Sequence, residues 1–98
     1  MSVDGNWCIV VATPLGERRG TLSLKSEGTT LKGSQMADGA SADIFDGTVN
    51  GNEVFWKVSI TDPMPMTLEF TGTVDGDEIA GTVKLGEFGN SSFTGIRS

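Results

Sequence analysis

Few residues of this chain have the side chains that catalysis or metal binding requires. The 98 residues include no histidine, which is the commonest general base and the commonest metal ligand. The single cysteine, Cys8, can form neither an internal disulfide nor a thiolate metal cluster. The sequence therefore predicts a protein that is not an enzyme and that binds no metal or other cofactor.

Two groups of charged residues could still do chemistry. The run Asp75-Gly76-Asp77-Glu78 is rich in carboxylates, but a calcium loop collects about six or more oxygen ligands from a longer segment. We interpret this run as a solvated turn. Acid–base catalysis by Asp43 with Arg18 would need a water-poor site, and the alternative for this pair is an ion pair at a rim, of little energetic consequence.

Binding of a small, mostly apolar molecule is the chemistry that the sequence favours. Such sites combine apolar walls with a few polar anchors. Met64 and Met66 flank Pro65 and would form an adaptable but partly stiffened flap, although a loop that only caps the core is the alternative. Beside Val11 and Leu85, the candidate ligand-binding residues are Thr13, Arg18, Gln35, Asp43, Ile60, Met64 and Met66.

Three two-residue turns are expected to position these residues. Glu27-Gly28, Asn50-Gly51 and Asp75-Gly76 each lie between runs in which apolar and polar residues alternate, which is typical of β-hairpins. One face of each hairpin is then apolar and the other polar. With these turns, the predicted cross-strand pairs include Leu24 with Leu31, Phe45 with Trp56, and Phe70 with Gly81.

The same alternation divides the side chains between interior and surface. The predicted interior consists of Trp7, Ile9, Val11, Leu22, Leu24, Leu31, Phe45, Val54, Trp56, Val58, Ile60, Met66, Leu68, Phe70, Ile79, Val83 and Leu85. Inward glycines are expected to share space with large residues opposite them: Gly33, Gly47, Gly72 and Gly81. Outward apolar residues form two groups on opposite sides of the molecule: Ile44 with Phe55, and Cys8 with Val10, Ala12 and Ile96.

About eight short antiparallel strands follow from these hairpins, from a first strand at residues 6–13 and from a last one near residues 90–97. No segment has the helical period of about 3.6 residues. We therefore predict a single all-β domain over residues 1–98, an eight-stranded antiparallel up-and-down (meander) barrel. A sandwich is the alternative, but a closed meander removes both sheet edges and fits the local pairing better.

The two ends of such a barrel differ. The three tight turns share one end with both chain termini, whereas the longer connections, 14–19, 36–42, 61–65 and 86–89, lie at the other end. Ligand sites are common in the mouths of β-barrels. We expect the candidate ligand-binding residues to converge at this mouth.

Parts of the sequence repeat. Residues 47–54 and 72–79 match at the same spacing, and residues 28–33 are a fainter copy of residues 76–81. The copies are too short and too few for a solenoid. Either a duplicated hairpin or convergent turn chemistry explains them.

The charge of the chain restricts its partners. With 13 acidic and 7 basic residues, the net charge is −6. This charge opposes contact with phosphate backbones and anionic lipids, so we expect no nucleic-acid and no membrane partner. No N-terminal apolar stretch reaches the length of a signal peptide or a membrane span, and a cytoplasmic location is the default expectation.

Gly5-Asn6-Trp7 at the start of the first predicted strand, together with Arg97 at the end of the last, resembles the pattern of the calycin superfamily of lipocalins, fatty-acid-binding proteins and avidins. The resemblance implies that Trp7 plugs the closed end of the barrel and that Arg97 stacks across it. A cation over an indole face contributes about 0.5–2 kcal/mol. Both residues are then structural rather than ligand-binding.

The short strands are most similar to those of the avidin-like branch. The chain departs from the superfamily in having no lipocalin disulfide, no helical lid and no complete polar set for biotin, so biotin binding is not implied. The resemblance implies a non-enzymatic barrel that binds a small, mostly apolar molecule at its mouth. The alternative is an accessory or interaction domain with a filled barrel, which could form a homo-oligomer through Ile44 and Phe55 or through Cys8, Val10 and Ile96.

Overall fold

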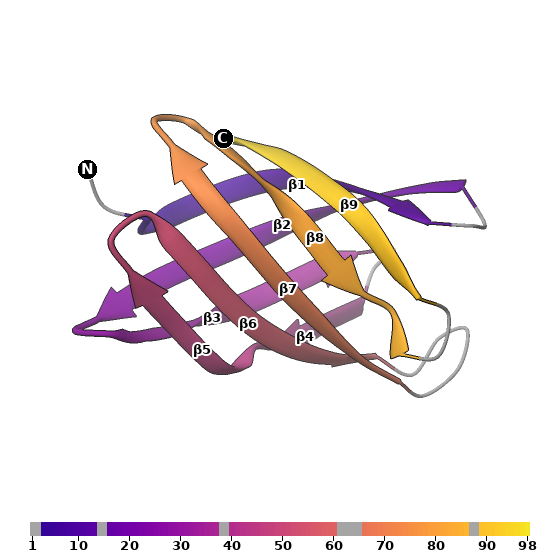
Figure 1. The fold of residues 1–98 in the computed structure, drawn as a ribbon, viewed down its shortest axis with the longest axis horizontal. Helices are drawn as coiled ribbons and strands as arrows, with labels where there is room; N and C mark the ends of the chain where they lie inside the picture. The colour runs from indigo at the N-terminus through magenta and orange to yellow at the C-terminus, as the bar shows by residue number, and fades with distance from the viewer. Residues whose placement is uncertain (1–2, 14–15, 38–39, 61–65, 87–88) are drawn as a thin grey trace.

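The computed structural model describes residues 3–13, 16–37, 40–60, 66–86 and 89–98, and most of them lie in antiparallel β-strands (Figure 1). The strands are β1 (Gly5–Thr13), β2 (Gly16–Glu27), β3 (Thr30–Ala37), β4 (Ala40–Asp43), β5 (Phe45–Asn50), β6 (Glu53–Ile60), β7 (Met66–Asp75), β8 (Glu78–Lys84) and β9 (Asn90–Arg97). None of the described residues forms a helix that is long and apolar enough to cross a membrane.

The strands form one closed sheet. β4 and β5 both pair with β3 and are separated only by Ile44, so they are two halves of one interrupted strand. The sheet continues in chain order through β6, β7 and β8 to β9, which pairs with β1, and the pairings of β2 with β1 and β3 complete the ring. The predicted all-β, eight-stranded antiparallel up-and-down barrel is confirmed.

All three tight turns lie one residue later than predicted. Their loop residues are Gly28-Thr29, Gly51-Asn52 and Gly76-Asp77, and the glycines have φ of 65°, 62° and 63°. In a type II′ turn, only the first of the two loop residues has a positive φ. The prediction placed glycine at the second of the two loop positions, which is typical of a type I′ turn. The predicted pairs are therefore wrong by two residues on one strand, which leaves the residues on their predicted faces. The exception is the start of β5, where Phe45 pairs with Lys57 rather than with Trp56. The structure pairs Leu24 with Gly33, Val49 with Val54, and Phe70 with Val83.

Strand β5 contains a β-bulge that the sequence analysis missed. Its register to β6 shifts between Phe45 and Thr48, and Asp46 in this interval has a φ of 52°, which aspartate tolerates better than most residues. One extra residue exchanges the two faces of the strand beyond it. The predictions that Phe45 points inward and Ile44 outward are therefore wrong, because Phe45 is 40% exposed and Ile44 is 8% exposed.

The rest of the predicted interior is buried wherever the structure describes its side chains. The side chains of Ile60 and Met66 lie outside the described part of the chain. Three apolar side chains that were not predicted inward join this core, Val3, Ile44 and Phe93, and Val74, on the predicted apolar face of its hairpin, is buried as well.

Three aromatic rings pack together in the interior. Trp56 stacks on Phe70 with 5.0 Å between ring centroids, and Phe93 meets these rings edge-on at 5.8 and 5.2 Å. Each such contact adds about 0.5–1.5 kcal/mol to the burial of the rings. Glycines provide the space, because a Cβ at Gly72 would lie 2.9 Å from Phe93 Cζ, and Gly81 pairs directly with Phe93. The prediction that Gly72 and Gly81 face large residues across their hairpin is wrong, because they pair with each other; the large residue that occupies the space beside them is Phe93 on β9.

The tight turns and both chain termini gather at one end of the barrel, as predicted (Figure 1). Arg97 Cζ lies 4.3 Å from the ring centroid of Trp7, which confirms the predicted stacking. The guanidinium also donates hydrogen bonds to the carbonyl oxygens of Asp4 at 2.6 Å and Gly76 at 3.3 Å, and its Nε forms an ion pair with Asp77 at 3.2 Å. Arg97 therefore connects the last strand to the first strand and to the β7–β8 turn.

The N-terminal residues add to this closed end. Trp7 Nε1 donates a hydrogen bond to the carbonyl oxygen of Val3 at 3.2 Å. The Asp4 carboxylate accepts hydrogen bonds from the backbone N–H and the hydroxyl of Ser26, both at 2.7 Å. These contacts hold the start of the chain against β2.

Replacing Arg97 by alanine is expected to lower the free energy of unfolding by about 2–3 kcal/mol, because the cation–π contact and the charged hydrogen bonds are lost. Arg97→Lys keeps a positive charge above the indole but not the planar fork, and should recover about half of this loss. Urea unfolding measures both changes. The exposed Lys25→Ala is the control, with an expected change below about 0.5 kcal/mol. A wild-type unfolding midpoint for Arg97→Ala would contradict the role of this contact.

Candidate functional site

The predicted mouth lies at the end of the barrel opposite the tight turns (Figure 1). Thr13 at the end of β1 pairs with Gly16, and Ile60 at the end of β6 pairs with Met66. The side chains of Thr13, Ile60 and Met66 lie outside the described part of the chain, as does all of Met64. The ligand-binding role of these four residues stays a prediction.

Gln35 lies on the inner face of β3, as predicted. It pairs with the buried Leu22 on β2 and with Ala42 on β4, which packs against the core. The side-chain oxygen Oε1 of Gln35 is itself buried and accepts no hydrogen bond from the described residues. An unsatisfied buried acceptor costs about 1–3 kcal/mol, so this oxygen requires an explanation.

Nε1 of Trp56 is a second buried polar atom without a hydrogen-bond partner among the described residues. The side chain of Trp56 is 0% exposed, and its ring packs on Phe70 and Phe93. Sequence reasoning assigned Trp56 to the core alone. The signal that it missed is that a buried indole keeps an N–H donor, which needs an acceptor. The interior thus presents one unpaired acceptor and one unpaired donor.

Arg18 and Asp43 do not share a face of the sheet. Arg18 pairs with the buried Val11, so it occupies an inward-facing position of β2 near the mouth. Its side chain is exposed there. Asp43 is exposed and pairs with Ser34 on the outer face. The bulge in β5 places the next residue, Ile44, inward, so Asp43 points outward. The prediction that Asp43 faces the interior is therefore wrong. The geometry gives no support to acid–base chemistry by this pair.

Burial is complete in the aromatic cluster and slightly lower in the aliphatic layer at the mouth. Trp56 and Phe70 in the aromatic cluster are 0% exposed. Val11 and Leu68, near the mouth-side ends of β1 and β7, and Leu85, directly after β8, are 7%, 8% and 7% exposed, and Val74 near the tight turns is 6% exposed. Solvent therefore touches an aliphatic layer at the mouth but not the aromatic cluster.

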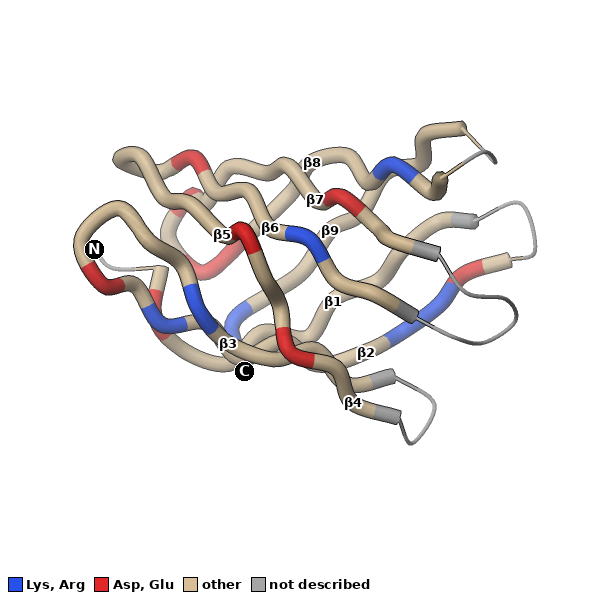
Figure 2. The backbone as a smooth tube through the Cα atoms, turned by 90° about the horizontal axis from the view of Figure 1, so that it is seen from below, with Lys and Arg blue, Asp and Glu red and all other residues tan. Residues whose placement is uncertain are grey.

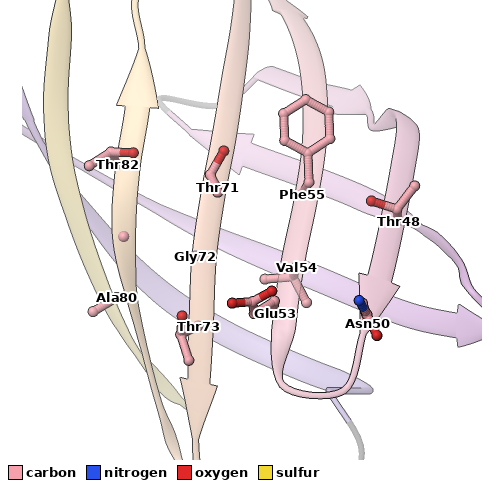
Figure 3. A pocket seen from close by; sticks show the side chains of 11 residues that line it. Thr48, Asn50, Glu53, Val54, Phe55, Thr71, Gly72, Thr73, Ala80 and Thr82 are labelled. Carbon is pink, nitrogen blue, oxygen red and sulfur yellow. The ribbon is translucent and has the colours of Figure 1, made fainter.

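The outer wall formed by β5, β6, β7 and β8 carries a shallow groove of about 340 Å³ (Figure 3). Phe55 lies here on the outer face, as predicted, and is half-buried. The groove offers several hydroxyls, one carboxylate and one aromatic ring. Its lining residues form two rows across the strands, Thr48, Phe55, Thr71 and Thr82 in one and Asn50, Glu53, Thr73 and Ala80 in the other.

A second outer groove of about 410 Å³ lies over β1, β8 and β9 and shares Ala80 with the first. Cys8, Val10 and Ile96 line it, which confirms that they point outward. The Cys8 thiol is free and the residue is exposed. Within the described ranges, no three metal-ligating side chains gather at either groove or elsewhere.

Charged residues form a band on the outer wall nearer the mouth. Lys57, Glu69 and Lys84 are cross-strand neighbours on β6, β7 and β8, so the sign of the charge alternates along the band (Figure 2). Lys57 also lies 3.8 Å from Asp46 in the bulge. Opposite charges in such positions contribute about 0.2–1 kcal/mol per pair. The band is therefore a stabilising surface feature.

Comparisons with known proteins find no match, either among the models of protein families or among curated proteins. Function is therefore inferred from the residues and their geometry alone.

Proposed function

We propose that this protein is a calycin-like binding barrel that holds a small, mostly apolar molecule in the mouth half of its interior. The closed meander, the Trp7–Arg97 contact at the closed end and the aliphatic layer at the mouth support this function. Eight-stranded barrels are just wide enough to hold one small ligand above a packed base. No catalytic group is needed for such a role.

The buried side-chain oxygen of Gln35 is the observation that carries the proposal. A ligand N–H or O–H would satisfy this acceptor, and a ligand oxygen would satisfy the Nε1 donor of Trp56. Trp56 and Leu22, the partner of Gln35 on β2, both belong to the apolar core. The ligand is therefore a mostly apolar molecule that carries both a donor and an acceptor, as a carboxamide does.

Three matched probes test this chemistry: benzamide carries a donor and an acceptor, methyl benzoate an acceptor only, and toluene neither. All three probes are added at one concentration, about ten times the Kd of benzamide. Benzamide binding then adds about 1.4 kcal/mol, which raises the melting temperature of a chain of this size by roughly 6–11 °C. We expect the largest rise with benzamide and the smallest with toluene. The absence of any rise, or equal rises with all three, would contradict the proposal.

Gln35→Met is expected to weaken benzamide binding about 2–10-fold, because a neutral hydrogen bond is lost. The free energy of unfolding should stay unchanged or rise by about 1 kcal/mol, since a buried unsatisfied oxygen is removed. Calorimetric titration and urea unfolding measure the two effects. Thr30→Met, on the outer face of the same strand, is the matched control and should leave the affinity unchanged. A Gln35→Met variant that loses stability but keeps its affinity would show that Gln35 is structural.

The second candidate function is an interaction domain with a filled barrel. The packed aromatic cluster and the exposed apolar side chains of the outer wall favour it. A binding barrel must respond to at least one of the three probes, whereas a filled barrel responds to none.

A further inference from the structure

The outer wall of β9, β1, β2 and β3 carries a row of exposed, uncharged side chains, which we call the apolar row. It consists of Ile96, Cys8, Thr21 and Met36, which pair in this order across the four strands. Ile96 is 60% exposed and Met36 is 53% exposed, and they are two of the three exposed large hydrophobic side chains in the described part of the chain. Neighbouring side chains in such a row are about 5 Å apart, so the row is a continuous strip.

The strip is continuous with the second outer groove. Cys8 and Ile96 belong to both, and Val10, Ala80 and Thr94 extend the uncharged surface by one row toward the mouth. A contiguous surface of this kind is typical of contact with another macromolecule, whereas single scattered apolar residues need no explanation.

The two sides of the apolar row carry opposite charge. Glu78 on β8 pairs with Ile96, and Asp75 on β7 pairs with Glu78 in turn. On the other side of β1, Arg19 on β2 pairs with Val10 in the neighbouring row. All three charged residues are exposed. The surface beside Cys8 therefore carries two carboxylates on one side and the Arg19 guanidinium on the other, with Glu17 one row further toward the mouth on β2.

We infer that this surface binds a second copy of the chain, in a dimer whose two-fold axis passes close to Cys8. A two-fold axis brings the same patch of both copies together, so that each contact between two different residues occurs twice, once in each direction. Rotation about this axis exchanges the acidic and basic sides and places Glu78 of each copy near Arg19 of the other. A partner of a single charge would satisfy only one side. The dimer does not depend on ligand binding at the mouth.

Sedimentation equilibrium over a range of protein concentrations tests the dimer. The wild-type chain is expected to double its mass reversibly, and Ile96→Asp to raise the dimer Kd at least about 100-fold, because a carboxylate would be desolvated near the centre of the interface. Phe45→Asp replaces the third exposed large hydrophobic residue, on β5, and should leave the mass unchanged. A wild-type chain that stays monomeric, or a dimer that Ile96→Asp does not weaken, would overturn the inference.

Exchange of charges tests the two-fold arrangement. Glu78→Arg places like charges at both symmetric contacts and should raise the dimer Kd about tenfold at low salt. The double variant Glu78→Arg with Arg19→Glu restores opposite charges and should bring Kd back to within about threefold of wild type. A double variant that binds no better than Glu78→Arg alone would overturn the proposed pairing.

Cys8 provides a test that needs no change to the interface. A short bis-maleimide should link the two Cys8 thiols of the dimer into a covalent product, and Cys8→Ser should give none. Crosslinking of Ile96→Asp measures the rate of random collisions. If the wild-type chain is crosslinked no faster than Ile96→Asp, Cys8 lies away from the axis and the arrangement is contradicted.

Discussion

Gly81→Ala is expected to lower the free energy of unfolding by about 3 kcal/mol or more, the upper part of the range for overpacked interiors. A Cβ at Gly81 would collide with the backbone oxygen of Thr71 and would lie 2.5 Å from the Cα of Gly72, its partner on β7. These are backbone atoms, so no side-chain rotation relieves the collision. Urea unfolding measures the loss, and the melting temperature should fall by roughly 12 °C or more.

Gly51→Ala separates this collision from the ordinary cost of replacing a turn glycine. Gly51 has a φ of 62° and nothing within 4 Å of an added Cβ, so alanine there meets only the conformational penalty of about 1–3 kcal/mol. Gly81→Ala should therefore be the more destabilising variant. If Gly51→Ala were the worse of the two, the close pairing of β7 with β8 at Gly72 would be contradicted.

Phe70→Ala is expected to cost about 3–5 kcal/mol, as is usual for a buried phenylalanine. The ring is 0% exposed and lies between Trp56, at 5.0 Å, and Phe93, at 5.2 Å. Its removal leaves a cavity that the aromatic neighbours cannot fill without giving up their mutual contacts. Guanidinium unfolding measures the loss, and near-ultraviolet circular dichroism should show weaker ordering of Trp56.

Phe45→Ala is the matched control, because it removes the same side chain at a position that is 40% exposed. Its expected cost is about 0.5 kcal/mol or less. The pair of variants also tests the bulge at Asp46, since a β5 strand without the bulge would point Phe45 into the core. Equal costs for Phe45→Ala and Phe70→Ala would contradict the bulge.

The alternation of apolar and polar residues is enough to predict the barrel and most of its core. It assigns Trp7, Ile79 and Val83 correctly because each strand keeps the two-residue period without a break. The turn positions were less well determined. Asn50-Gly51-Asn52 contains both a favoured type I′ and a favoured type II′ pair, and the two choices put the same residues on the same faces. The faces could therefore be predicted even though the pairing was wrong.

The bulge marks the limit of this reasoning in β4 and β5. Asp46-Gly47 does not interrupt the apolar alternation, so the left-handed conformation of Asp46 has no clear signal in the sequence. One extra residue then turns Ile44 inward and Phe45 outward, and it moves Asp43 out of the candidate site. The error in the site is thus a consequence of one local backbone conformation.

Of the candidate site, the sequence could predict the inward position of Gln35 but not that its side-chain oxygen is buried without a hydrogen bond. Whether Oε1 of Gln35 and Nε1 of Trp56 find partners depends on side-chain rotamers and on neighbours brought together by the barrel. Alternation carries no information about these. The apolar row could be predicted in part, because alternation already placed Cys8 and Ile96 together on the outer face. Met36 joins the row through its pairing with Thr21, which depends on the position of the turn at Gly28-Thr29.

The two indole N–H signals in the proton–nitrogen NMR spectrum test the proposed interior binding site most directly, with Trp56→Phe to assign them. Benzamide is expected to shift the signal of Trp56, whose Nε1 has no partner among the described residues, in a saturable manner. The signal of Trp7 should stay in place, because its Nε1 is bonded to Val3 at the closed end. A Trp56 signal that does not move, or that moves together with the Trp7 signal, would contradict ligand binding inside this barrel.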